Sequence, residues 1–359
     1  MESGTGRKYP WSYRRKRHAL RSRLAGLQSR LPEPVRTVLG RAGRRYSIER
    51  ATRDLPPIRH VQIQTHSRCN ADCVFCPYTQ SWHHAHPGQM SEALFNRILR
   101  ELKPWEHLLN RGTIAPYLMQ EPMADPAIID RIEAIYAAFP NTSVEISTNG
   151  EPLTPKRGEA LVKALIGRKH EIWISHHGMD AETLKRVMDT RYDRSVANIV
   201  HLLRVADGRL NIRIVGAGQS LDGAISYFDE SRYRSYWQQI LAENSVPERG
   251  VEIETIRFHD RAGTLRREGM PRGGIIREIG PANPFRCYRV DEWLHVLHDG
   301  RIRLCCMDYH GEVELPSLAD TTLVEYFRSE TYKSLLQSVT GAKETADDFI
   351  CKRCQTPGG

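Results

Sequence analysis

The chain has 359 residues, 40% of them hydrophobic, so it can bury a large core in one main domain and a smaller second one. No run approaches the roughly 18 apolar residues of a membrane span and no segment resembles a secretory leader, so we expect a protein of the reducing cytoplasm. The net charge of +9 would suit nucleic acid, but residues 1–50 alone carry fourteen Lys or Arg against three Asp or Glu. The other residues are slightly acidic together, and we do not expect a nucleic-acid partner.

The basic charge belongs to an N-terminal arm, which we place at residues 1–58. Its apolar residues Leu20, Leu24, Leu27 and Leu31 recur at helical spacing among arginines, which predicts a basic amphipathic helix. Such a helix either touches a polyanion, a membrane surface or an acidic partner, or packs against the main domain with its charges in solvent.

A first group of cysteines follows the first expected strand. Cys69, Cys73 and Cys76 stand in a C-x3-C-x2-C array. Three soft thiolates on one short loop can wrap three irons of a cubane cluster and leave the fourth iron open for chemistry. The competing interpretation is a structural zinc site completed by His66, although structural zinc normally takes four closed ligands. Disulfides are not expected in a reducing compartment.

From residue 61 to residue 258, short β-like runs alternate with helical patterns, which predicts a parallel sheet with right-handed crossovers. The expected strands are 61–65, 113–119, 143–148, 171–176, 210–215 and 251–258. The expected helices are 92–102, 126–138, 156–166, 180–188, 196–207 and 231–243. We therefore predict an α/β fold, a partial (β/α)6 barrel of the TIM type, over residues 59–265.

Three polar motifs follow the second, third and fourth expected strands, at the edge where parallel sheets bind ligands. They are Met119-Gln120-Glu121-Pro122, Ser147-Thr148-Asn149-Gly150 and Ile174-Ser175-His176-His177-Gly178. Glu121 belongs either to a binding segment or to the cap of the following helix. The hydroxyl and amide groups of the second motif suit a ribose diol, and the same four residues also make a good turn.

The third motif carries two adjacent imidazoles, which titrate near neutrality and can contact a polar substrate or move a proton. Alternation along a strand places one ring inside the barrel and the other against a helix. We expect His176 to be the catalytic one. After the fifth strand, Val215-Gly216-Ala217-Gly218-Gln219 lacks the third glycine of a dinucleotide fingerprint, so its glycines are expected to allow close approach of a ligand.

A second group of cysteines returns in a smaller domain at residues 280–356. Cys287, Cys305, Cys351 and Cys354 flank a hairpin predicted at 293–304 with an Asp-Gly turn, and a helix is expected at 323–338. Four thiolates saturate a cubane cluster, and zinc bound by the same four is the alternative.

These motifs together resemble those of the radical S-adenosylmethionine (SAM) enzymes with a C-terminal SPASM or twitch domain, over about residues 61–356. The resemblance implies that Cys69, Cys73 and Cys76 hold a [4Fe-4S] cluster whose open iron binds SAM. An electron from that cluster then yields a 5′-deoxyadenosyl radical that removes a hydrogen atom from the substrate. The shorter, twitch version implies one auxiliary [4Fe-4S] cluster on the second group of cysteines.

The resemblance also assigns the SAM contacts. Met119, Gln120 and Glu121 stand where the family has Gly-Gly-Glu and binds the SAM amino group through backbone carbonyls, although both glycines are replaced here. The other expected SAM contacts are Ser147 and Asn149 for the ribose or methionine part and Ser175 for the carboxylate.

Cys306, next to the expected ligand Cys305, is left over. A weak thiol S–H bond can return a hydrogen atom to a substrate radical, as in radical SAM epimerases. Alternatively, Cys306 is a small buried hydrophobe or replaces Cys305 as ligand. If the auxiliary cluster instead takes an electron while a base removes a proton, the enzyme is a carbinol dehydrogenase, which is the second expectation.

Both reactions suit a sugar, aminoglycoside or aminocyclitol in antibiotic assembly, with a flavodoxin or ferredoxin as reducing partner. Two further alternatives stay open. One is a maturase of a ribosomal peptide, although residues 1–60 lack the alternating strands of a leader-binding wing. The other is a zinc-containing nucleic-acid-binding protein.

Overall fold

The computed structural model describes residues 54–220, 225–265, 277–280, 283 and 285–355, with six single positions between residues 32 and 42. The predicted basic helix of the N-terminal arm lies outside the described residues. Over the part of the chain that is described, no helix has the length and apolar character needed to cross a membrane.

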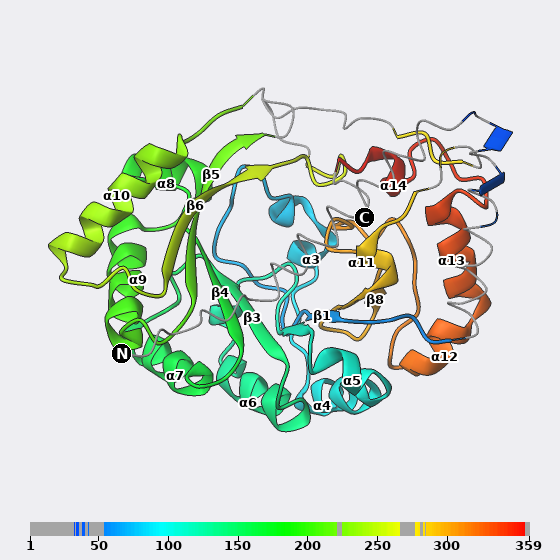
Figure 1. Ribbon diagram of the computed structural model, residues 1–359, viewed down its shortest axis with the longest axis horizontal. Coiled ribbons are helices and arrows are strands. Elements are labelled where there is room, and N and C mark those ends of the chain that lie inside the picture. The colour runs from blue at the N-terminus through cyan, green and yellow to red at the C-terminus, as the bar shows by residue number, and fades with distance from the viewer. Residues whose placement is uncertain are drawn as a thin grey trace.

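The described strands form one open sheet in the order β6-β5-β4-β3-β2-β1-β7-β8 (Figure 1). The first six, all parallel, are β1 (His60–Ile63), β2 (Thr113–Ala115), β3 (Ser143–Thr148), β4 (His170–Ser175), β5 (Ile212–Ser220) and β6 (Val251–Phe258). β7 (Trp293–Val296) is parallel to β1, and β8 (Ile302–Arg303) is antiparallel to β7. The expected α/β fold is confirmed, as a sheet that does not close.

The longer helices follow the strands and cover the outer, convex face of the sheet (Figure 1). They are α4 (Glu92–Glu101), α6 (Ile128–Ala138), α7 (Pro155–Leu165), α8 (Ala181–Met188), α9 (Tyr192–Ala206) and α10 (Glu230–Glu243). Their starts have local causes. Ser91, Asp180 and Asp229 accept hydrogen bonds from backbone N–H groups of the first turns of α4, α8 and α10.

The remaining elements complete the fold, among them the helix α13 of 11 residues. They are η1 (Tyr78–Gln80), α3 (Trp82–Ala85), η2 (Lys103–Trp105), α5 (Glu106–Leu109), η3 (Pro122–Ala124), α11 (Tyr288–Asp291), α12 (Leu323–Arg328), α13 (Glu330–Thr340) and α14 (Ile350–Arg353). The single helix expected at 323–338 is therefore two helices. Ser329 separates them because its extended backbone ends α12 and its hydroxyl accepts from Tyr332 N at the start of α13.

The two faces of the sheet differ in character. On β4, Ile172 and Ile174 enter the hydrophobic core, while Glu171, Trp173 and Ser175 alternate with them on the opposite face. The register pairs Glu145 of β3 with Glu171, so these carboxylates share that inner face. The concave side of the sheet is thus a polar wall, and the apolar side is covered by helices.

Two strand boundaries differ from the expectation. β2 ends at Ala115 because Pro116 follows, and proline has no N–H for the ladder. β5 runs on to Ser220, with an irregular register between Ala217 and Ser220, so Gly216 and Gly218 belong to a strand. The glycine-rich segment is therefore part of β5 and does not form a phosphate-binding turn.

The predicted C-terminal hairpin is present and extends the main sheet. Its turn closes with Leu297 N donating to Arg301 O at 2.9 Å, and Gly300 has φ of +88°, which a glycine adopts without strain. β7 lies against β1 over four residue pairs, from His60 with Trp293 to Ile63 with Val296. The hairpin that precedes Cys305 and Cys306 therefore shares one sheet with the strand that leads into the first cysteine loop.

The turn after β4 makes a prediction about packing. A Cβ atom on Gly178 would lie 2.5 Å from the Leu184 Cα and N atoms of α8, so Gly178→Ala should destabilise the fold by about 1–3 kcal/mol. Gly158→Ala inside α7 is the matched control. Its nearest neighbour is Leu202 Cδ1 at 3.7 Å, and it should stabilise by about 0.5–1 kcal/mol. Urea unfolding of both variants checks the contrast, and equal effects would contradict it.

Candidate active site

The first cysteine loop lies at the carboxyl end of β1 and is held from two sides. Asp72 N donates to Met188 O at 2.8 Å and Val74 N to Val187 O at 2.9 Å, which attaches the loop to the end of α8. The Tyr78 hydroxyl accepts from Cys69 N at 3.0 Å and donates to Ser67 O at 2.7 Å. The backbone of the loop is thus positioned without using the sulfur atoms.

The three thiols of this loop are partly exposed and form one electrostatic group. Burial raises the pKa of Cys69 and Cys73, and the neighbouring Cys76 thiol raises both further. Ionising all three would be costly in the protein alone. Iron supplies the compensating positive charge, so the donor set fits a cluster held by Cys69, Cys73 and Cys76.

Glu121 joins three of the strand-end loops. Its carboxylate accepts from Met123 N at 2.9 Å, from the Thr148 hydroxyl at 2.7 Å and from Asn149 N at 2.8 Å. Its backbone N donates to Arg68 O at 3.1 Å. The side chain therefore caps η3, as one of the two interpretations held, and also ties the segment Met119–Pro122 to the end of β3. The backbone N of Glu121 ties the same segment to the first cysteine loop.

The backbone of the segment Met119–Pro122 leaves acceptors available. Within the described residues, no hydrogen bond reaches the carbonyl groups of Met119 and Gln120, although both residues are buried. The carbonyl of Glu121 faces His66 Nε2 at 3.1 Å. Two carbonyl groups without a hydrogen bond in the described part of the chain fit the expected contact with an amino group.

The other expected SAM contacts lie at the same edge. Ser147 and Ser175 stand on the inner face of β3 and β4, partly exposed. Asn149 is buried, and its side-chain amide donates to Asn70 Oδ1 of the cysteine loop at 2.9 Å. The structure thus brings Ser147, Asn149 and Ser175 to the rim above the first cysteine group.

The two adjacent histidines point in different directions, and the choice of His176 needs correction. His176 Nε2 lies 3.2 Å from the Ser195 hydroxyl of α9, and its ring packs at 5.1 Å against Trp237 of α10. The ring of His177 instead meets Phe75 of the cysteine loop edge-on at 4.8 Å. β4 ends at Ser175, so strand alternation no longer decides which ring faces inward.

The second group of cysteines gathers around α11 and α14. Cys351 is part of the hydrophobic core, and Cys287, Cys305 and Cys354 pack against it. Burial and the nearby Cys354 thiol raise the pKa of Cys287 to about 11. Cys305 Sγ accepts from Met307 N at 3.4 Å, the type of contact that supports a ligating sulfur. These four thiols fit a second cluster on the same charge argument as the first.

An apolar cluster lies between the first cysteine loop and Cys306. Its buried members, which we call the bridging cluster, are Tyr78, Leu118, Met119, Leu297 and Tyr309, and Cys69, Cys76 and Cys306 pack against it. Tyr309 Oη lies 3.5 Å from Cys76 Sγ. Cys306, the partly exposed sequence neighbour of Cys305, thus packs against the same apolar cluster as two cysteines of the first loop.

The sequence analysis missed Tyr117, Glu145 and Tyr309 as site residues. Tyr117 donates to Glu145 Oε1 at 2.6 Å on the inner face of the sheet. Burial and Glu145 raise the pKa of Tyr117, and Cys306 adds to this effect. Position along the chain gives no hint of these contacts, although Tyr309 follows the Cys305–Cys306 pair by only three residues.

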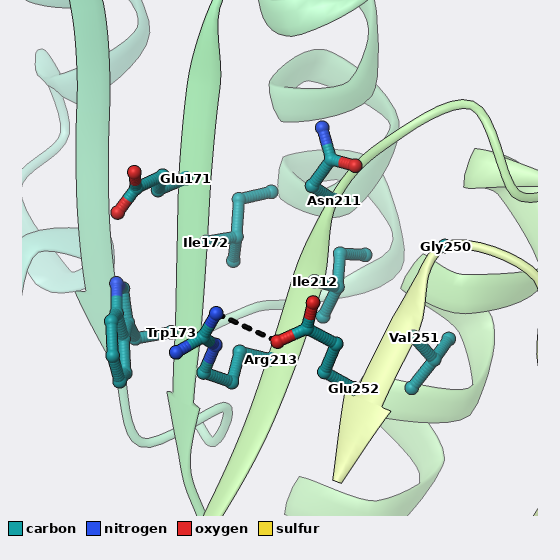
Figure 2. Close-up of a pocket in the computed structure, with 9 residues that line it drawn as sticks. All are labelled: Glu171, Ile172, Trp173, Asn211, Ile212, Arg213, Gly250, Val251 and Glu252. Atoms are coloured by element: carbon teal, nitrogen blue, oxygen red, sulfur yellow. Dashed lines mark ion pairs between the residues drawn. The ribbon is translucent and has the colours of Figure 1, made fainter. Parts of the chain in front are cut away.

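A pocket of about 230 Å³ on β4, β5 and β6 lies away from this site. Figure 2 shows Trp173, Arg213 and Glu252 beside it, with Arg213 paired to Glu252. Its lining residues come from the first halves of the strands, whereas the cysteine loop follows the carboxyl end of β1. No group of three or more His, Cys, Asp or Glu side chains in the described part is arranged to hold a single metal ion.

Comparisons with known proteins agree with this geometry. Residues 63–223 match the family model described as the Radical SAM superfamily, and residues 287–355 match SPASM, an iron-sulfur cluster-binding domain. No curated protein sequence matches the chain.

Solved structures show the same fold. BtrN in complex with AdoMet and 2-DOIA has 15% sequence identity and a TM-score of 0.52, over 83% of this chain and 93% of that one. SuiB of Streptococcus suis bound to S-adenosylmethionine has 14% identity and a TM-score of 0.53, over 90% of this chain and 78% of that one. SuiB bound to its precursor peptide SuiA has 15% identity and a TM-score of 0.51, over 86% and 73%.

Glu121 makes the stability of the protein depend on pH. Burial raises its pKa to about 7 despite three hydrogen bonds to the carboxylate. A folded-state pKa above the unfolded value means that this stability is fully present below about pH 4.5 and is lost as the pH rises through 7. The unfolding free energy of wild type relative to Glu121→Gln should therefore fall by up to about 3 kcal/mol across this window. Urea unfolding at several pH values measures this difference, and a constant difference would contradict the prediction.

Proposed function

The chain is a radical SAM enzyme with a C-terminal iron-sulfur cluster-binding domain, and we propose that it inverts a carbon centre of a sugar, aminoglycoside or aminocyclitol. Cys69, Cys73 and Cys76 would hold the first [4Fe-4S] cluster, and Cys287, Cys305, Cys351 and Cys354 would hold the auxiliary one. When bound, the first cluster with SAM supplies a carbon radical able to remove a hydrogen atom from an unactivated C–H bond. The chain itself must then bind the substrate and return a hydrogen atom.

The position of Cys306 carries the proposal. Cys305 lies near the other thiols of the second group. Its pKa is raised most by burial, then by Cys306, and further by Cys351 and Cys287. Cys306 packs on the bridging cluster with Cys69 and Cys76, on the side of the first cysteine loop. If Cys305 is a ligand and Cys306 is not, the free thiol would stand next to the second cysteine group and pack on the same cluster as Cys69 and Cys76.

Cys306 would act as the hydrogen donor. Its S–H bond breaks homolytically while a C–H bond forms on the substrate radical, and each atom contributes one electron. Return from the face opposite to the abstraction inverts the centre. An electron from a flavodoxin or ferredoxin and a proton from solvent then restore the thiol.

The inner face of the sheet supports a polyhydroxylated or amino-bearing substrate. Glu145 and Ser175 lie on this face, and the Tyr117 hydroxyl donates to Glu145 Oε1. Carboxylates bind amines, and tyrosine and serine hydroxyls exchange hydrogen bonds with sugar hydroxyls. Of the acidic residues near the cysteines, Glu121 is already occupied, and Asp308 accepts from Glu312 N at 2.8 Å.

A carbinol dehydrogenase is the second candidate. The second group of cysteines lies directly beside Cys306, which would suit an auxiliary cluster as electron acceptor, and the fold matches BtrN, whose crystal structure contains AdoMet and 2-DOIA. A peptide maturase is supported only by the fold shared with SuiB, which has been crystallised with a precursor peptide. The division into domains at 59–265 and 280–356, action in antibiotic assembly and a cytoplasmic location belong to the same proposal.

Replacing Cys306 by alanine separates the first two candidates. Wild type and Cys306→Ala, reconstituted without oxygen, should both bind about eight irons, because two cubane clusters use the other seven cysteines. Both should form 5′-deoxyadenosine with candidate aminoglycosides or aminocyclitols. In deuterated water the wild type should give an inverted product carrying deuterium, and the variant should lose that product.

Other outcomes contradict the proposal in distinct ways. A ketone product that survives Cys306→Ala identifies a dehydrogenase. Loss of about half the iron in Cys306→Ala identifies Cys306, and not Cys305, as the ligand, and Cys305→Ala is the matched comparison. A wild type that binds zinc and little iron would contradict the assignment of the seven cysteines as ligands of iron-sulfur clusters.

A further inference from the structure

Tyr309 contacts the first cysteine group from the C-terminal part of the chain. Its hydroxyl oxygen lies 3.5 Å from Cys76 Sγ, and the side chain is only 5% exposed. It belongs to the bridging cluster, whose other members come from the segment after the cysteine loop, from the loop after β2 and from the hairpin turn. The contact therefore joins two segments more than 200 residues apart.

The chemistry of a cluster ligand decides the direction of this hydrogen bond. A cysteine bound to iron is a thiolate and has no proton to give, so the Tyr309 hydroxyl must be the donor. A tyrosine hydroxyl is protonated at neutral pH, so its O–H group is available as a donor. The site thus has a neutral O–H group directed at one of the three sulfurs of the first group.

Local structure holds Tyr309 in this position. Asp308 N donates to Cys305 O at 3.1 Å and Tyr309 N to Met307 O at 3.0 Å, which makes a tight turn directly after the second cysteine group. The Asp308 carboxylate accepts from Glu312 N at 2.8 Å and fixes the other side of the turn. The phenol ring is then packed by apolar neighbours, so little freedom remains for the hydroxyl to leave Cys76.

Tyr78 offers a comparison within the same cluster. Its hydroxyl accepts from Cys69 N and donates to Ser67 O at 2.7 Å, so both its hydrogen-bonding roles are used by backbone atoms. In the described part of the chain, Tyr309 is the tyrosine with a hydroxyl contact to a sulfur of the first group. Tyr78 shapes the loop, whereas Tyr309 acts on a ligand atom.

We propose that Tyr309 is a positioning residue that raises the reduction potential of the SAM-binding cluster by donating a hydrogen bond to Cys76 Sγ. A reduced cluster carries one more negative charge than the oxidised one, and a hydrogen bond to a ligating sulfur stabilises the reduced state more. The C-terminal part would in this way help a reducing partner to transfer an electron to the first cluster. The inference rests on the assignment of Cys76 as a cluster ligand, and not on which product the enzyme forms.

The test is a potentiometric titration of the full chain, reconstituted without oxygen and followed by electron paramagnetic resonance. The signal that changes on addition of SAM identifies the first cluster. In Tyr309→Phe the ratio of reduced to oxidised cluster at a fixed potential should fall about tenfold, which corresponds to 59 mV for a one-electron couple. Tyr136→Phe is the matched control, because the Tyr136 hydroxyl donates to Lys169 O and contacts none of the described cysteines, and the potential of this variant should stay near that of the wild type.

A second replacement guards against a packing effect of phenylalanine. Incorporation of 3-fluorotyrosine at position 309 keeps the shape of the ring and strengthens the O–H donor, so the potential should shift in the opposite direction. Unchanged potentials in both proteins, or an equal shift in Tyr136→Phe, would overturn the inference. Iron content is measured in each sample. A wild type without a SAM-responsive signal would overturn the ligand assignment and this inference with it. Whether the product is inverted or oxidised tests only the proposed reaction.

Discussion

The parallel pairing of β1 with β7 is the constraint on which the two halves of the site depend. β1 is buried along its whole length and leads directly into the first cysteine loop. β7 lies beside it in register, and Gln64 N, just beyond β1, donates to Val296 O at 2.8 Å. Because a slip of one residue would turn every side chain of a strand to the other face, this register is strongly specified. The hairpin that carries Cys305 and Cys306 is therefore placed by the sheet itself.

The consequence is a shared wall between the two cysteine groups. The bridging cluster forms only when the loop after β2, the segment after Cys76 and the hairpin turn all meet. Its apolar members exclude water from the sulfur atoms on that side, and a lower local dielectric strengthens every polar contact there. A single hydroxyl at 3.5 Å from Cys76 Sγ consequently has more electrostatic effect than it would have at a surface.

Much of this arrangement could be predicted from the sequence, because its determinants are local. Spacing along one loop identified the first cysteine group, alternation of strand and helix patterns predicted the parallel sheet, and the Asp-Gly turn predicted the hairpin. The double role of Glu121 was harder to predict. The sequence suggested a cap or a binding segment, and the structure shows the cap together with hydrogen bonds to Thr148 and Asn149 of another strand.

The remaining features depend on contacts between distant segments. The orientation of His176 follows from α9 and α10, whose side chains take up its ring, and no pattern within Ile174–Gly178 distinguishes it from His177. The contact of Tyr309 with Cys76 depends on the β1–β7 register. The helix expected at 323–338 is divided because Ser329 is both the end of one helix and the cap of the next, which periodicity alone does not reveal.

The surroundings of Cys306 bear on the choice between inversion and oxidation. Oxidation of a carbinol requires a base that accepts a proton, whereas hydrogen return from a thiol does not. His176 faces the helices, and burial lowers the pKa of His177 to about 3, so its ring is a weak base. Glu145 is a carboxylate on the inner face that could accept a proton, and its Oε1 already accepts a hydrogen bond from the Tyr117 hydroxyl at 2.6 Å. None of these three described side chains is well suited to accept a proton from a carbinol. The thiol of Cys306 needs no such base to donate a hydrogen atom, which is why inversion is the first candidate.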